Sequence, residues 1–464
     1  MKQTIAIFLI LVSAFNCEMR EKSVQETEAI IDRPNIIIVL ADDLGYGDLG
    51  CQGHPWIKTP NIDRLAREGQ RWTSFYAASC VCNPSRAALL TGRLPIRIHG
   101  GTTTWADVAA EEETIAELLK SQGYATACIG KWHLGMAAGH HPVDRGFDYF
   151  YGLAGSNDAP IAEGIGFERT YDNIKTAPFS AFDIHLYRQR EVIEDTVRQD
   201  LLTQRYTREA QEWIADHNDQ PFLLYLAYNM PHVPIYASAN FRNRSRGGLY
   251  GDVVEEIDWS VGDIIKWLEQ HGLDTNTLVI FTSDNGPWLT YYDLGGSAGP
   301  LRDGKITAWE GGFRVPAIFW WPGKIQPGVV HDIGSNVDIA ATLSALLNID
   351  LSEDRIYDSE DLSPVLLKRM AGPRKTFFYY GRFPDDIWAA RVGAYKLQFR
   401  GRNSIGSEEV GWRGYSEVME FNPPKLYNLQ TDISERFDIA DRNPEIISAI
   451  RNVIHEHRLS MAKN

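Results

Sequence analysis

The sequence predicts an α/β protein with a doubly wound sheet and helices on both of its faces. Continuous apolar runs are typical of strands buried on both faces of a parallel sheet, and the chain has three of them, at residues 35–40, 221–228 and 278–283. Helical patterns separate these runs up to about residue 350, which is the alternation expected of such a sheet. We therefore expect one large domain over residues 34–350.

A smaller α+β subdomain is expected over residues 351–464. From Lys375 onward the pattern changes to short strands, at 377–380 and 395–399, and the chain ends in a helix at about 444–457. The sequence shows no internal repeat.

Residues 1–17 have the pattern of an export signal. Lys2 gives a basic start, and residues 4–14 form an apolar run too short to span a bilayer comfortably. Cys17 is a candidate for lipid modification, with an ordinary cleaved signal as the alternative. We expect an exported protein in the periplasm or at the cell surface, or else a secreted one, with residues 18–33 as a polar tether.

Several helices have clear boundary signals. Thr59-Pro60 begins a helix that should end at Gly69. Residues 114–117 read Thr-Ile-Ala-Glu, a capping box that starts another helix. The charged stretch 188–217 contains a helix, and residues 250–270 form a further one with an apolar face.

Oxygen-bearing side chains follow two of the predicted strands. Asp42 and Asp43 come directly after the first apolar run, and Asp284 and Asn285 come directly after the third. In open α/β sheets, ligands bind at the carboxyl ends of strands, and oxygen ligands suit a hard metal ion. Taken alone, the Asp42-Asp43 pair could also be a plain acidic turn.

A short helix with unusual chemistry at its entrance is predicted after Cys82. Asn83 is a good N-cap residue, Pro84 suits the first helical position, and Gly92 suits the residue past the helix end. Cys82 should thus lie just before a helix N-terminus, where backbone N–H groups and the helix dipole favour an anion. Arg86 lies about one turn away and could face the same point.

Further candidate residues lie in loops. Lys131 and His133 are two positions apart after a predicted strand at 124–129, so in an extended segment both point the same way. His232 is flanked by prolines that stiffen its loop, and Lys305 lies in a Gly-rich loop. Each could instead be a solvated side chain.

Charge and cysteine content narrow the functional classes. The formal net charge is −15, which argues against a nucleic-acid partner because that binding depends on basic surface. An anionic substrate would need a local cationic pocket. The four cysteines beyond residue 17 are too few for a disulfide framework in so long a chain.

The stretch Cys82-Asn83-Pro84-Ser85-Arg86, followed by Leu90-Thr91-Gly92-Arg93, resembles the signature of the type I, formylglycine-dependent sulfatases. Five further stretches match in the order that this family has them: Asp42-Asp43, Gly130-Lys131-Trp132-His133, Pro231-His232-Val233-Pro234, Ser283-Asp284-Asn285-Gly286, and Lys305 with Glu310-Gly311-Gly312. The resemblance covers about residues 34–345 and returns at 425–429. It is closest to the arylsulfatase A and N-acetylgalactosamine-6-sulfatase branch, and it implies an alkaline-phosphatase-like sheet.

This resemblance implies a site and a mechanism. A maturation enzyme would convert Cys82 to formylglycine (3-oxoalanine), whose hydrate attacks sulfur and later expels sulfate. A Ca²⁺ ion would be held by Asp42, Asp43, Asp284, Asn285 and the modified Cys82. Arg86 and Lys131 would hold the hydrate, with His133 assisting it. The substrate sulfate would contact His232 and Lys305, which can protonate the leaving oxygen, and Ser156 is a further candidate contact.

The implied substrate is a sulfated polysaccharide or oligosaccharide, either algal, of the ulvan or carrageenan type, or a glycosaminoglycan. Residues 159–220, where sugar specificity would be decided, do not align convincingly with the family. Two alternatives stay open: a phosphodiesterase or phosphonate hydrolase on the same fold, and a non-catalytic binder of sulfated glycans in which Cys82 stays unmodified. The oligomeric state cannot be predicted.

Overall fold

The computed structural model describes residues 33–98, 107–381, 387–404 and 409–461. The predicted signal, Cys17 and all of the predicted tether except Arg33 lie outside these ranges. The chain from Arg33 onward forms one compact unit. Across the ranges described, none of the helices combines the length and the apolar character needed to cross a membrane.

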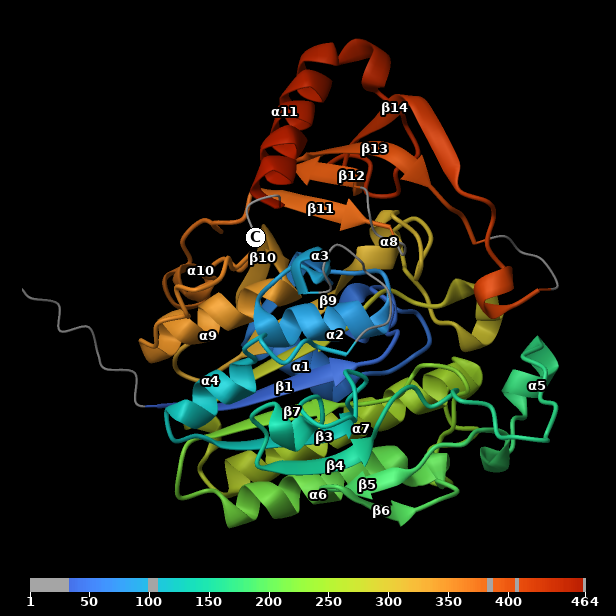
Figure 1. Cartoon of the computed structure of the whole chain (residues 1–464), viewed down its shortest axis with the longest axis vertical. Helices are drawn as coiled ribbons and strands as arrows, with labels where there is room; N and C mark the ends of the chain where they lie inside the picture. Colours follow the sequence, from blue (N-terminus) through green and yellow to red (C-terminus); the bar gives the residue numbers. More distant parts are fainter. Residues whose placement is uncertain (1–32, 99–106, 382–386, 405–408, 462–464) are drawn as a thin grey trace, which may run out of the picture. The chain divides into compact units, whose positions relative to one another are not determined.

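A ten-stranded mixed sheet forms the centre of the described chain (Figure 1). Its strands, in spatial order, are β10 (Gly328–Ser335), β2 (Gln70–Tyr76), β9 (Arg314–Trp320), β8 (Thr277–Ser283), β1 (Asn35–Ala41), β7 (Phe222–Ala227), β3 (Ala125–Lys131), β4 (Tyr149–Leu153), β5 (Leu186–Arg188) and β6 (Glu191–Glu194).

The predicted apolar runs are the central strands of this sheet. β1 runs parallel to β7 on one side and to β8 on the other, and all seven of its residues are buried. The prediction of a buried parallel centre is therefore confirmed. The flanks differ, because β9 is antiparallel to both β2 and β8, and β5 and β6 form an antiparallel hairpin at one edge.

Helices cover both faces of the large sheet. On one face, α1, α6 and α7 share a hydrophobic core with Ile37 and Val39 of β1. On the other, α2 places Arg86 near Cys128 and Tyr225, side chains outside that core. The helices are α1 (Pro60–Glu68), α2 (Cys82–Thr91), α3 (Pro95–Ile98), α4 (Ile115–Ser121), α5 (Tyr171–Lys175), α6 (Leu202–Asp216), α7 (Gly248–Gln270), α8 (Glu310–Phe313), α9 (Ile339–Leu347), α10 (Ser363–Lys368) and α11 (Pro444–Met461).

The C-terminal part forms a separate, four-stranded antiparallel sheet, as the change in pattern after Lys375 predicts. Its strands are β11 (Thr376–Tyr380), β12 (Ile387–Val392), β13 (Tyr395–Gly401) and β14 (Met419–Asn428), and α11 packs against β12 and β13. Phe377 and Tyr379 of β11 pack in one buried cluster with Tyr76 and Phe313, which joins the small sheet to the large one.

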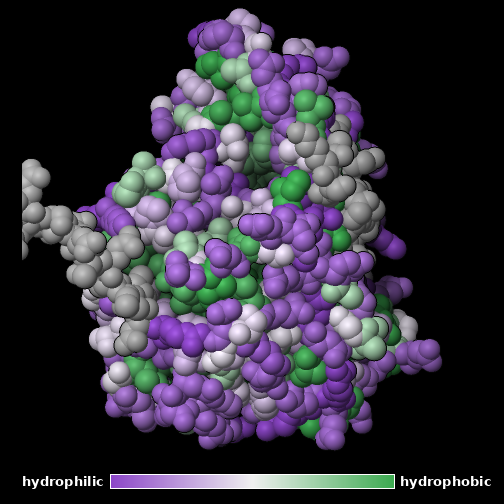
Figure 2. Space-filling view, turned by 60° about the vertical axis from the view of Figure 1, so that its left-hand side comes forward, coloured by the Kyte–Doolittle hydropathy of each residue, from purple (hydrophilic) through white to green (hydrophobic). Residues whose placement is uncertain are grey.

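The surface drawn in Figure 2 is mostly hydrophilic, and the hydrophobic residues on that face form separate patches. This agrees with the acidic composition of the chain.

Candidate active site

The carboxyl ends of β1 and β8 place four oxygen-bearing side chains together. Ala41 pairs with Ser283, so Asp42 and Asp284 leave the sheet side by side. The Asp43 backbone N–H donates to Asp284 Oδ1 over 3.1 Å, and Asn285 Nδ2 donates to Asp43 Oδ1 over 2.7 Å. All four are buried, which confirms the predicted proximity.

Cys82 lies at the same place, but the helix it belongs to begins earlier than predicted. α2 starts at Cys82 itself, its N-cap residue is Val81, and no side chain caps it. The prediction that Asn83 is the N-cap is wrong, because Asn83 lies inside the helix, whose first bond runs from the Ser85 N–H to the Val81 carbonyl over 3.3 Å. The Asn83 amide Nδ2 instead donates to the carbonyl of His133 over 2.5 Å. Gly92 does follow the helix end, with φ of 69°.

The Cys82 thiol is fully buried beside two carboxylates. Its sulfur and carboxylate oxygens of Asp42 and Asp284 all lie within 4.8 Å of one another. Burial raises the pKa of this thiol to about 11. Since the thiolate is the nucleophilic form, an unmodified Cys82 is a poor nucleophile at neutral pH.

Three buried cations face three buried carboxylates. Lys131 Nζ lies 2.5 Å from Asp42 Oδ2, and Lys305 Nζ lies 2.6 Å from Asp43 Oδ1. Arg86 contacts Asp284 over 2.8 Å. Burial alone would raise the pKa of the Asp42 carboxyl, but Lys131, His232 and Arg86 outweigh it and hold that pKa below its usual range.

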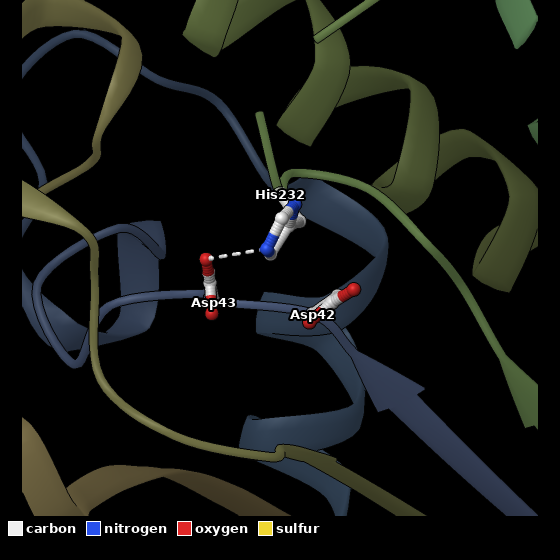
Figure 3. Close-up of side chains that lie close together, drawn as sticks. All are labelled: Asp42, Asp43 and His232. Atoms are coloured by element: carbon white, nitrogen blue, oxygen red, sulfur yellow. Dashed lines mark ion pairs between the residues drawn. The ribbon is translucent and has the colours of Figure 1, made fainter. Parts of the chain in front are cut away.

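His232 points one ring nitrogen into this cluster (Figure 3). Its Nε2 lies 3.6 Å from Asp43 Oδ2. Its Nδ1 faces two acceptors, Val233 O at 2.6 Å and Asn157 Oδ1 at 3.1 Å, so Nδ1 carries a proton that fixes the ring. Burial lowers the pKa of His232, and Lys305 acts in the same direction.

His133 lies near the cluster, but its backbone conformation differs from the extended one that was predicted. Its φ is 66°, so the segment after β3 is not extended and the argument from alternation does not hold. Its backbone N–H donates to the carbonyl of Ala154 over 2.9 Å. Burial, followed by the charges of Lys131 and Arg86, holds the pKa of His133 well below its usual value.

Ser156 is buried in the next loop, and its neighbours bring residues that the sequence did not single out. Asn157 holds His232, as described above, while its Nδ2 donates to Pro234 O and Gln199 Oε1, each over 3.0 Å. Trp288 packs against the His232 ring at 5.3 Å, and Lys305 Nζ lies 4.3 Å from its centroid. In the sequence, Asn157 could have been suspected because it follows Ser156, and Trp288 because it lies three positions after Asn285.

The donor set fits a hard divalent cation. Asp42, Asp43, Asp284 and Asn285 offer only oxygen, the ligand that Ca²⁺ prefers. Within the described residues, Asp42 Oδ1 and Asn285 Oδ1 are buried without a hydrogen-bond partner, which is costly for oxygen atoms unless something binds them. Because three carboxylates balance three cations, a divalent cation would also leave the site positive enough to attract an anionic ester.

Comparison with known proteins gives one consistent result. A family model described as Sulfatase matches residues 34–349, and one described as C-terminal region of aryl-sulfatase matches residues 372–464. The chain is 38% identical to arylsulfatase A of Homo sapiens over 445 residues, which cover 92% of this chain and 88% of that one. It is also 38% identical to N-acetylgalactosamine-6-sulfatase of Mus musculus over 475 residues, covering 92% and 86%.

Two solved structures extend this likeness to the fold. PsFucS1 sulfatase from Pseudoalteromonas sp. superimposes with a TM-score of 0.82 at 30% identity, covering 93% of this chain and 91% of that one. Ps i-CgsB in complex with k-i-k-neocarrahexaose superimposes with a TM-score of 0.75 at 30% identity, covering 92% of each chain. The first matched stretch, 34–349, contains every residue of the cluster described above.

Proposed function

The chain belongs to the sulfatase family and is a sulfuric ester hydrolase, and we propose that its substrate is a sulfate ester on a carbohydrate. Two relatives support a sugar substrate: one is named for N-acetylgalactosamine 6-sulfate chemistry, and one structure holds a neocarrahexaose. The observation that carries the proposal is the meeting of Cys82, three carboxylates and three cations in one buried cluster.

We propose that Asp42, Asp43, Asp284 and Asn285 hold a Ca²⁺ ion together with the modified Cys82. The ion would supply positive charge to the oxygens of the sulfate. Lys131, which pairs with Asp42, and Lys305, which pairs with Asp43, add cationic charge. Fixed charges of this kind in a buried site stabilise the charge that develops as the S–O bond breaks. Arg86 keeps Asp284 oriented and also donates to the Lys131 carbonyl over 3.0 Å.

Cys82 is proposed to be oxidised to formylglycine by a separate maturation enzyme. The aldehyde hydrate would supply a hydroxyl nucleophile, which gives covalent catalysis. The position supports this, since a residue at the first turn of α2 has its side chain beside both Asp42 and Asp284. His133 is proposed to take a proton from this hydrate.

His232 and Lys305 are proposed to bind the sulfate and to protonate the leaving oxygen. His232 is supported by its geometry, because Nδ1 is held by Val233 and Asn157 and Nε2 is turned into the cluster. Lys305 contributes an ammonium group that contacts both carboxylate oxygens of the same Asp43, over 2.6 and 2.8 Å. Ser156 is proposed as a further sulfate contact.

A parallel assay of sulfate and phosphate esters tests the proposed function. We expect purified protein with converted Cys82 to hydrolyse 4-nitrophenyl sulfate and sugar sulfates faster than 4-nitrophenyl phosphate or a phosphonate monoester. A strong preference for phosphorus esters would favour a phosphodiesterase or phosphonate hydrolase instead. Mass spectrometry of the Cys82 peptide from the native host tests the conversion, and an intact thiol there would favour a non-catalytic binder.

We also propose that residues 1–17 export the protein to the periplasm or cell surface. The basic Lys2 and the apolar run 4–14 support this. Cell fractionation with mass spectrometry of the mature N-terminus tests it: a diacylglycerol group on Cys17 would indicate a lipoprotein, and a free new N-terminus an ordinary cleaved signal. An intact Met1 in the cytoplasm would contradict export.

A further inference from the structure

A pocket of about 530 Å³ lies beside the cluster. None of the residues that line it has a role in the active site proposed above. Three separate stretches line it: residues 167–170, Tyr291, and residues 409–413. We call it the flanking pocket. In Figure 1 α5, which follows the first stretch, lies at the right-hand side, as does the turn that precedes β14. The volume is in the range of pockets that bind small ligands.

The flanking pocket shares a wall with the cluster. Tyr291 lines the pocket and packs edge-on against Trp288, with ring centroids 4.9 Å apart. Trp412 lines it too and packs on Trp288 at 5.3 Å. Trp288 also contacts His232 and Lys305. A molecule whose sulfate reaches His232 therefore has this pocket next to it.

A second line of contacts joins the pocket to His232. Arg169 lines the pocket and holds Asp158, with Nη2 donating to the backbone carbonyl over 2.5 Å and Nη1 lying 3.4 Å from Oδ2. Asp158 follows Asn157, whose Oδ1 accepts from His232. Arg169 therefore links the pocket to the loop that carries Asn157.

The small C-terminal sheet supplies one side of this pocket through the turn before β14. Gly411 has φ of 62°, and a Cβ added there would lie 2.8 Å from Tyr291 Oη. Thr290 Oγ1 donates to the Gly411 carbonyl over 3.2 Å. The turn is thus docked on the 290–291 segment, and it carries Trp412 and Arg413 to the pocket.

The lining has the chemistry of a sugar site. Two partly exposed aromatic rings, from Phe167 and Trp412, can pack against the C–H face of a pyranose, and the buried Tyr291 lies behind them. Glu168 and Glu409 can accept hydrogen bonds from hydroxyl groups, and Arg169 and Arg413 can donate them. Because the charges are balanced, the lining suits a neutral polyhydroxylated ring better than a second strongly anionic group.

We propose that the flanking pocket binds the sugar ring whose hydroxyl carries the sulfate, and that Trp412 and Arg413 determine which sugars are accepted. This inference rests on the proposed function, because it assigns the leaving alcohol of that reaction. It places part of the substrate specificity in residues 409–413, outside the stretch that carries the cluster.

The ratio of two catalytic efficiencies tests the proposal. One substrate is 4-nitrophenyl sulfate, which has no sugar, and the other is the best of galactose 4-sulfate, galactose 6-sulfate and N-acetylgalactosamine 6-sulfate. In Trp412→Ala we expect kcat/KM for the sugar sulfate, relative to that for the aryl sulfate, to fall about tenfold or more. Arg413→Ala should lower the same ratio, and Trp412→Phe covers the case in which the alanine variant fails to fold.

The matched control is Arg451→Ala. Arg451 is an exposed arginine that lines a different pocket, between α11 and the small sheet. Its ratio should stay within about twofold of the wild-type value. An unchanged ratio in both Trp412 variants and in Arg413→Ala, or an equal fall in Arg451→Ala, would overturn the proposal.

A binding measurement separates this proposal from the proposed function. Cys82→Ala carries no sulfur or oxygen on Cβ from which formylglycine could form, so ligand-observed NMR with the same sugar sulfate reports on binding without turnover. We expect the sugar-ring signals to show contact in Cys82→Ala and to lose it in Cys82→Ala/Trp412→Ala. Equal contact in both would contradict the assignment of the pocket. A wild-type enzyme that hydrolyses no sulfate ester would instead contradict the proposed function.

Discussion

At the scale of single residues, Asn285 shows how hydrogen bonds orient a side chain for a metal ion. Its Nδ2 donates to Asp43 Oδ1 over 2.7 Å and to the Gly286 carbonyl over 2.9 Å. These two bonds fix the amide, and Oδ1 is left buried without a hydrogen-bond partner among the described residues. Asn285 thus binds a carboxylate through its Nδ2, while its Oδ1 is available to a cation.

Removing that oxygen should weaken the binding of Ca²⁺. We expect added Ca²⁺ to raise the Tm of the wild-type protein and a chelator to lower it, because an ion that binds only the folded state stabilises that state. In Asn285→Ala the shift should shrink markedly. Asn276→Ala, which lies just before β8 at the opposite end of the strand, is the control and should keep the full shift. Differential scanning calorimetry measures both; an equal shift in the two variants would exclude Asn285 as a ligand.

His232 is predicted to matter most for substrates with poor leaving groups. If it protonates the leaving oxygen, His232→Gln should lower kcat about 10²–10⁴-fold for a sugar sulfate, the usual range for general acid catalysis. For 4-nitrophenyl sulfate, whose phenolate leaves readily without a proton, the loss should be much smaller. Steady-state kinetics with both esters test this. Equal losses would mean that His232 acts by binding sulfate alone.

At the scale of elements, the end of β3 depends on a close backbone approach. β3 lies between β7 and β4, and a Cβ added at Gly130 would lie 1.8 Å from the carbonyl oxygen of Ala227 in β7. Gly130 also has φ of 114°, which side chains rarely adopt. The next residue is Lys131, so the glycine allows the pairing that sets the position of that ammonium group.

Gly130→Ala should therefore destabilise the fold and displace Lys131. Gly139→Ala is a matched control, since Gly139 also has a positive φ, of 86°, but nothing lies within 4 Å of an added Cβ. The control should lose about 1–3 kcal/mol from backbone strain alone, and Gly130→Ala should lose clearly more together with most activity. Urea denaturation and sulfate-ester assays measure the two effects. Similar losses in both variants would show that the β7 contact is unimportant.

At the scale of the whole molecule, the sequence predicted the centre of the structure better than its edges. The runs that became β1, β7 and β8 were recognisable because both faces of these strands are buried. The short edge strands β5 and β6 lack that signal, since most of their residues face solvent at least partly. The burial of a strand therefore determines how easily it can be predicted from the sequence.

The site also contains residues that could be predicted from the sequence and residues that could not. Asp42, Asp43, Asp284 and Asn285 could be placed together because parallel strands end at one edge of a sheet. Asn157, Trp288 and Trp412 could not, because their roles depend on contacts between loops that are far apart in sequence. The start of α2 was misplaced because its first hydrogen bond runs from the Ser85 N–H to the Val81 carbonyl, so the helix begins before Asn83 without a capping side chain.

A buried charge cluster joins the two sheets. Lys396 of β13 has its Nζ 2.7 Å from Glu435 and 3.2 Å from Glu310 of α8, and it donates to the Ala308 carbonyl over 2.8 Å. Tyr379 of β11 donates to the same Glu310 over 2.5 Å. Lys396 and Tyr379 of the small sheet thus contact Glu310, which lies in α8 directly before β9 of the large sheet. Glu310 follows Lys305 by five positions in the chain.

Lys396→Met should destabilise the whole molecule and not only the small sheet. The change keeps the length of the side chain but leaves the buried Glu435 without its cation, while Glu310 keeps Arg314 as a partner. Breaking a buried pair in this way costs about 3–5 kcal/mol. Lys425→Met on neighbouring β14 is the control: Lys425 is only partly buried and lies over the Phe421 ring, so its loss should be below about 1 kcal/mol. Urea denaturation followed by fluorescence gives both free energies of unfolding. We expect a single, earlier transition in Lys396→Met, because the large sheet loses its contacts with the small one at the same time. A separate early transition with the large sheet unchanged would show that the two sheets are energetically independent.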